Sequence, residues 1–238
     1  MIKRIILIGD SIAQGYFEYV IKSIKFTEPG IILDSGDRLI VNSKFLGSWD
    51  QNGRSCLFKM QTNTKDITQL EILYLGNGTT RKALDLIKTI NLSNEDFIHL
   101  NCGLHDLGRP EPLIKNMLSK KQVNITEYAE NLEKIFAFIR NKEAVVLWGS
   151  TTPVEEISVF RNRGWQQRLT KDVELYNIVA KRICHERNIQ INDIYAKILP
   201  EHKHLLLKDG VHFSEEGYKV LGKIVSESIV QVFEDLFK

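Results

Sequence analysis

Hydrophobic and polar positions follow two different periods along the chain, and each change of period marks an expected element. Residues 5–8 are a continuous apolar run, which is typical of a strand that is buried on both faces of a parallel sheet. From Ser11 onward, apolar residues recur at the spacing of one helix face. The pattern therefore predicts a strand, a sharp turn at Gly9 and Asp10, and a helix that begins near Ser11.

The alternation of strand and helix periods resumes after residue 68. Further strands are expected at 70–75, 96–101, 144–148 and 189–192, and further helices at about 79–90, 125–139, 171–185 and 215–237. Parallel strands need long crossovers, and helical crossovers cover both faces of a sheet. We therefore expect an α/β protein, a three-layer α/β/α sandwich with a five-stranded parallel sheet.

Residues 26–68 depart from this alternation. They contain several glycines, short β-like runs and the aromatic residues Phe45 and Trp49, a mixture that favours hairpins or a long loop. We interpret this stretch as an insertion within a single domain that spans residues 1–238. Ordered excursions of such length often form an active-site wall, so the insertion is expected to line the pocket, with a plain surface loop as the alternative.

Composition and charge narrow the classes of partner. The 238 residues include 32 Lys and Arg against 30 Asp and Glu, so no strong field favours nucleic acid or an anionic membrane. The sequence lacks an apolar stretch of membrane-spanning length. Its three cysteines lack metal-ligand spacing, which favours reduced thiols and a cytoplasmic location. A small-molecule substrate is the best expectation, and the oligomeric state is left open.

Ser11 stands where the first strand gives way to a helix. Backbone N–H groups and the positive end of the helix dipole meet at such a position. A serine there can attack a carbonyl while its own N–H stabilises the resulting oxyanion. The alternative is an ordinary helix cap, because Asp and Ser are common at helix N-termini.

A second candidate group, the segment from Asp209 to His212, lies just before the last expected helix. A carboxylate three residues before a histidine can hold one ring nitrogen, which leaves the other free to accept a proton from a serine. Ser11 follows the carboxyl end of a parallel strand, the rim where open α/β sheets place their sites. The two motifs together predict a nucleophile and its base.

Residues 9–12, Gly-Asp-Ser-Ile, resemble the first block of the SGNH hydrolases, also called the GDSL family. The segment from Asp209 to His212, followed by Ser-Glu-Glu-Gly, resembles the last block of that family. The resemblance implies a flavodoxin-like arrangement of the sheet. It also implies that Ser11 is the nucleophile, His212 the base and Asp209 the residue that orients the base.

The same resemblance implies an oxyanion hole. The N–H of Ser11 and that of a glycine after the second family strand contribute to it, and Gly78 matches this glycine better than Gly76 does. The third family block is Gly-x-Asn-Asp, whereas this chain has Gly-Leu-His-Asp at residues 103–106. His105 thus stands in place of the usual amide, and an imidazole N–H can also donate a hydrogen bond. Asn101 is the rival donor.

These features predict a serine hydrolase that cleaves an ester through an acyl-enzyme. The expected substrate carries a small acyl group such as acetyl on a carbohydrate or related metabolite. The reaction requires no metal or cofactor. Asp10, Trp148 and Arg161 are candidates for contact with the substrate. The alternatives are an O-acyltransferase and a non-catalytic carbohydrate- or metabolite-binding module on the same fold.

Overall fold

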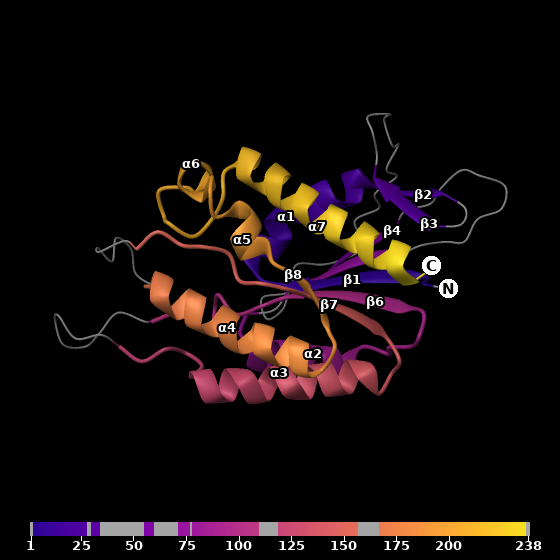
Figure 1. Ribbon diagram of the computed structural model, residues 1–238, viewed down its shortest axis with the longest axis horizontal. Coiled ribbons are helices and arrows are strands. Elements are labelled where there is room, and N and C mark those ends of the chain that lie inside the picture. The colour runs from indigo at the N-terminus through magenta and orange to yellow at the C-terminus, as the bar shows by residue number, and fades with distance from the viewer. Residues whose placement is uncertain are drawn as a thin grey trace.

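The computed structural model has three layers, with helices on both faces of a central sheet (Figure 1). It describes residues 2–27, 30–33, 55–59, 71–76, 78–109, 119–156 and 167–236. Across the sheet the strands are β4 (Ser55–Lys59), β5 (Glu71–Gly76), β1 (Arg4–Gly9), β6 (Asp96–Asn101), β7 (Val145–Gly149) and β8 (Gln190–Asn192).

The five expected parallel strands are confirmed. β5, β1, β6, β7 and β8 all pair in parallel, and their order across the sheet is the 2-1-3-4-5 order of flavodoxin-like folds. A sixth strand that the sequence pattern did not predict, β4, pairs antiparallel with β5 at the edge of the sheet. It belongs to the expected insertion, whose short β-like runs gave no sign of the edge on which they would pair.

A separate antiparallel pair, β2 (Ile24–Thr27) and β3 (Gly30–Leu33), begins two residues before the expected insertion and continues into it. The expectation of hairpins in this stretch is thus partly confirmed. Residues 34–54 and 60–68 lie outside the described residues, so the expected pocket wall stays a prediction.

Among the described residues, five long helices form the two outer layers. α1 (Ser11–Ser23) and α7 (Glu215–Leu236) cover one face of the sheet, and α2 (Thr80–Thr89), α3 (Ile125–Arg140) and α4 (Thr170–Glu186) cover the other (Figure 1). Two short helices that were not predicted, α5 (Ile194–Ile198) and α6 (His202–Leu205), precede α7. Each is too short to show a helical period. None of the helices in the described ranges is long and apolar enough to cross a membrane.

The hydrophobic core lies on both faces of the two central strands. Every residue of β6 is buried, and the apolar run in β1 is at most 1% exposed. This burial explains why neither strand alternates between polar and apolar residues. Cys102 and Cys184 are buried, and neither forms a disulfide with another described residue.

α1 and α7 pack closely because glycines lie where they meet. A Cβ placed on Gly15 of α1 would lie 2.1 Å from the ring of Tyr218 in α7. Likewise, a Cβ on Gly222 of α7 would lie 2.4 Å from Cβ of Tyr19. The hydrogen at each glycine therefore sets the separation of the two helices, and with it the position of the segments that precede them.

Candidate active site

Ser11 is the first residue of α1, directly after the carboxyl end of β1. The turn is held by Asp10, whose Oδ1 accepts a hydrogen bond from the N–H of Ile12 at 2.9 Å. The hydroxyl of Tyr74 donates to the carbonyl of Asp10 at 2.8 Å and fixes the turn from β5. Asp10 was expected to contact substrate, but its side chain is 3% exposed and caps the helix instead.

His212 and Asp209 meet Ser11 across the interface between the first and last long helices. Nε2 of His212 lies 2.8 Å from Oγ of Ser11, and Nδ1 lies 2.8 Å from Oδ2 of Asp209. With hydrogen on Nδ1, the ring donates to Asp209 and presents the lone pair of Nε2 to the serine hydroxyl. The three residues predicted from two separate motifs are thus brought together in one hydrogen-bonded chain.

Local backbone geometry turns Asp209 toward the histidine. Gly210 has φ of 73°, a left-handed conformation that glycine adopts readily, and it reverses the chain between the two side chains. Oδ1 of Asp209 accepts from the N–H groups of Val211 at 2.9 Å and His212 at 2.8 Å. Burial raises the pKa of Asp209, but these hydrogen bonds and the His212 ring outweigh it and lower the pKa. Asp209 is therefore ionised at neutral pH.

The loop that carries His105 is clamped to the start of α2. Both carboxylate oxygens of Asp106 accept from the N–H of Thr80, at 3.1 and 3.0 Å, and the Thr80 hydroxyl also donates to this carboxylate. As a result, Gly78 and His105 lie next to each other, since a Cβ on Gly78 would lie 3.9 Å from Nδ1 of His105. The structure therefore brings the two candidate oxyanion donors together and gives Asp106 a bracing role.

The electrostatic environment keeps His105 neutral. Burial is the largest cause that lowers its pKa, and the charges of Arg168, Lys82 and His212 lower it further against the opposing effect of Asp10. A neutral imidazole carries hydrogen on one ring nitrogen, so His105 can donate one hydrogen bond, as an amide does.

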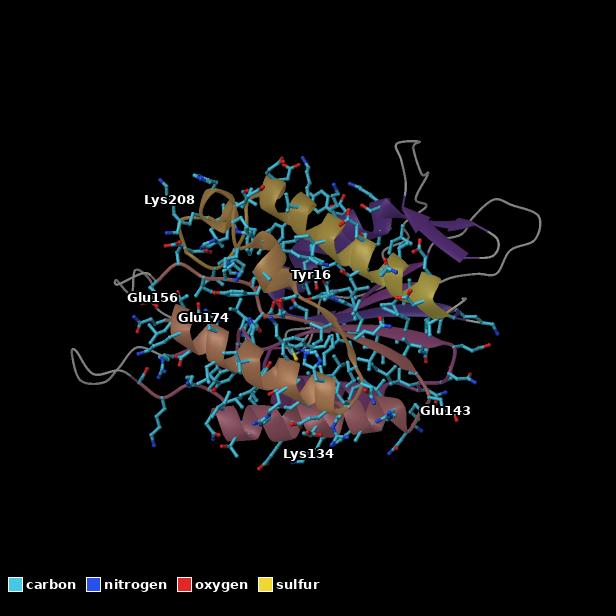
Figure 2. The ribbon with its side chains drawn as sticks, in the orientation of Figure 1. Tyr16, Lys134, Glu143, Glu156, Glu174 and Lys208 are labelled. Carbon is cyan, nitrogen blue, oxygen red and sulfur yellow. The ribbon has the colours of Figure 1, made fainter. Side chains whose placement is uncertain are left out.

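Asn101, the rival donor, makes its hydrogen bonds to backbone carbonyls instead. Its amide nitrogen donates to the carbonyls of Gly149 at 3.1 Å and Ser150 at 3.0 Å, and its side chain is buried. An amide nitrogen has two hydrogens, and both are directed at these carbonyls. Tyr16, labelled near the middle of the molecule in Figure 2, lies 3.5 Å from the Asn101 carbonyl oxygen. Asn101 thus holds β6 to the end of β7, and the geometry favours His105 as the oxyanion donor.

Arg168, which no sequence motif indicated, lies between β7 and α4. Its Nε donates to the carbonyl of Leu104 at 2.6 Å, directly before His105. Burial lowers its pKa, while the charges of Asp10 and Asp209 raise it. The only signal in the sequence was a basic loop, and the arginine singled out there was Arg161.

The other two expected substrate contacts take different positions. Trp148 is fully buried in the hydrophobic core, which gives its ring a packing role inside the sheet rather than a surface for substrate. The physical reason is that Trp148 lies inside β7, one of the covered strands. Arg161 falls outside the described residues.

Comparison with known families decides the class of this protein. The sequence profile of the GDSL-like lipase/acylhydrolase family matches residues 7–220, from β1 into α7. The chain belongs to this family. It is a carboxylic ester hydrolase with the α/β fold of the family, and it acts on a small-molecule ester. A catalytic triad and an oxyanion hole are typical of such enzymes, and the elements described above supply candidates for both.

Solved structures share the fold over almost the whole chain. One is a catalytic mutant of an acetylxylan esterase from Geobacillus stearothermophilus, at 16% identity and a TM-score of 0.62, covering 95% of this chain and 94% of that one. A GDSL-like lipase from Bacteroides thetaiotaomicron has 16% identity and a TM-score of 0.56, covering 97% and 89%. A lipolytic G-D-S-L family member from Veillonella parvula has 16% identity and a TM-score of 0.55, covering 94% and 96%. Curated protein sequences give no match.

Proposed function

We propose that this esterase works through an acyl-enzyme on Ser11 and releases a small acyl group, acetyl, from a carbohydrate or related metabolite. The observation that carries the mechanism is the hydrogen-bonded chain from Ser11 Oγ through His212 to Asp209, with both contacts at 2.8 Å. The acetyl and carbohydrate preference is supported by the fold shared with an acetylxylan esterase.

In the first half of the reaction, Ser11 Oγ attacks the ester carbonyl while Nε2 of His212 takes the hydroxyl proton. The ionised Asp209 stabilises the imidazolium that forms. Negative charge develops on the carbonyl oxygen, where the N–H groups of Ser11 and Gly78 and the ring N–H of His105 stabilise it.

The first tetrahedral intermediate then collapses, and the C–O bond to the alcohol breaks. His212 gives its proton to the departing alcohol oxygen, which leaves an acyl ester on Ser11. A water molecule then attacks this ester while His212 accepts a proton from that water. Collapse of the second intermediate releases the carboxylic acid and returns the proton to Ser11.

A fluorophosphonate probe tests the nucleophile directly. The purified protein should be labelled at Ser11, labelling should vanish in Ser11→Ala, and it should persist in Ser23→Ala, a matched serine at the other end of α1. A protein that resists labelling but binds acetylated oligosaccharides would instead be a non-catalytic module.

A panel of p-nitrophenyl esters from acetate to laurate, run beside acetylated sugars, tests the acyl preference. The expected result is highest kcat/KM for acetate and release of free acetate from the sugars. A preference for laurate would refute the acetyl assignment. Transfer of acetyl to an added sugar alcohol in place of water would identify an O-acyltransferase.

A further inference from the structure

Lys82 in the first turn of α2 bends back toward the oxyanion end of the site. A Cβ placed on Gly78 would lie 3.4 Å from Cδ and 3.8 Å from Nζ of Lys82. The same point lies 3.9 Å from Nδ1 of His105. An ammonium group therefore lies beside both candidate oxyanion donors that come from outside α1.

The cation next to Lys82 in the sequence behaves differently. Arg81 uses two guanidinium nitrogens to bind the carboxylate of Glu127, so its charge is neutralised on the surface. Within the described ranges, Lys82 forms no ion pair, and its side chain is exposed. Its charge is thus available to a molecule that reaches Gly78.

A second cation acts on the same part of the site. The charges of Arg168 and Lys82 both lower the pKa of His105, so both act on its ring. Of the nearby carboxylates, Asp106 binds Thr80 and Asp209 binds His212. Asp10 caps α1, and its charge opposes the two cations by raising the pKa of His105. The edge formed by Lys82, Gly78 and His105 is therefore the positive edge of the candidate site.

We propose that Lys82 is a specificity-determining residue that selects esters carrying a carboxylate close to the scissile carbonyl. The inference rests on the proposed function, since it requires the ester carbonyl to lie against Gly78 and His105. An ammonium at this edge attracts an anionic group on the bound substrate and leaves a neutral analogue without a partner. Because Lys82 is exposed, water screens the pair, and the preference is expected to be about two- to fivefold.

Matched pairs of substrates test this specificity. One pair carries the charge on the alcohol, 4-acetoxybenzoate against 4-acetoxybenzamide, and the other carries it on the acyl chain, p-nitrophenyl hydrogen glutarate against p-nitrophenyl valerate. The measured quantity is the ratio of kcat/KM for the charged ester over its neutral partner. Fluorophosphonate labelling of Ser11 confirms that each variant has an assembled site.

The wild-type protein should prefer the charged member of at least one pair, and 0.5 M salt should weaken that preference. Lys82→Gln should bring the ratio close to one, and Lys82→Arg should restore it. Lys88→Gln, which removes an exposed lysine near the other end of α2, should keep the wild-type ratio.

Three results would overturn the inference. The ratio could be the same in Lys82→Gln as in the wild type. Both members of a pair could lose activity equally in Lys82→Gln, which would mean that the ammonium acts on the oxyanion and not on a substrate charge. Absence of labelling and of hydrolysis in the wild type would refute the proposed function itself, and the inference with it.

Discussion

Gly15→Ala offers a test of how the packing of two helices controls the candidate triad. Gly15 lies one turn after Ser11 on α1, and its new Cβ would lie 2.1, 2.2 and 2.5 Å from three ring atoms of Tyr218. Ordinary carbon contacts are about 3.5–4.0 Å, so the ring must retreat by more than about 1 Å. Tyr218 also packs edge-on against Phe213, with ring centroids 6.1 Å apart, which restricts its escape. We therefore expect α1 and α7 to separate.

Separation of the helices should damage activity more than stability. Overpacking costs about 1–3 kcal/mol, and the gain in helix propensity from Gly to Ala returns about 1 kcal/mol. The expected net loss in the free energy of unfolding is therefore about 0–2 kcal/mol. Ser11 Oγ lies 2.8 Å from His212 Nε2, and a shift of about 1 Å takes this pair beyond hydrogen-bond range. A misplacement of that size costs roughly 100-fold in turnover.

The assay combines kcat for p-nitrophenyl acetate with urea unfolding followed by circular dichroism. Glu18→Ala, an exposed change on the same helix, is the control and should leave both measurements unchanged. Tyr218→Leu in the Gly15→Ala background removes the obstructing ring and should recover much of the lost turnover. Wild-type kcat in Gly15→Ala, or no recovery in the double variant, would refute the idea that this contact sets the triad geometry.

Three further predictions concern the site. Ser11→Ala and His212→Ala should each lower ester turnover by roughly 10³-fold or more, and the double variant should be little worse, because the two residues act as a unit; multiplicative losses would contradict this. His105→Ala should lower kcat by about 10²–10³-fold with a smaller effect on KM, and His105→Asn should recover much of it. Asn101→Ala should mainly lower the urea midpoint, and the reverse pattern would make Asn101 the donor. Burial raises the pKa of Asp106 to about 7, so the folded state holds this proton more tightly than the unfolded state does. The free energy of unfolding of the wild type should therefore fall as pH rises from about 4 to 7, by on the order of 4 kcal/mol relative to that of Asp106→Asn. Parallel pH profiles of this free energy for the two proteins would contradict the prediction.

The parts of the fold that the sequence could predict are those that depend on local pattern. The apolar run in β1 indicated a strand covered on both faces, and the motifs around Ser11 and His212 predicted a candidate triad whose three side chains lie within hydrogen-bond distance in the structure. The antiparallel pairing of β4 could not be predicted, because a short β-like run does not say which edge it will join. Arg168 could not be predicted either, since its relation to His105 exists only after α4 packs beside the loop.

The tertiary hydrogen bond between Ser11 and His212 joins residues that are 201 positions apart in the chain. During synthesis at about 5–20 residues per second, the serine is added to the chain roughly 10–40 s before the histidine is. Through that interval Ser11 lacks the histidine that would accept its proton. The candidate nucleophile and its base can therefore meet only after residues 209–236 have been made and α7 has packed on α1, so a fragment that ends before residue 209 should not be labelled by the fluorophosphonate probe.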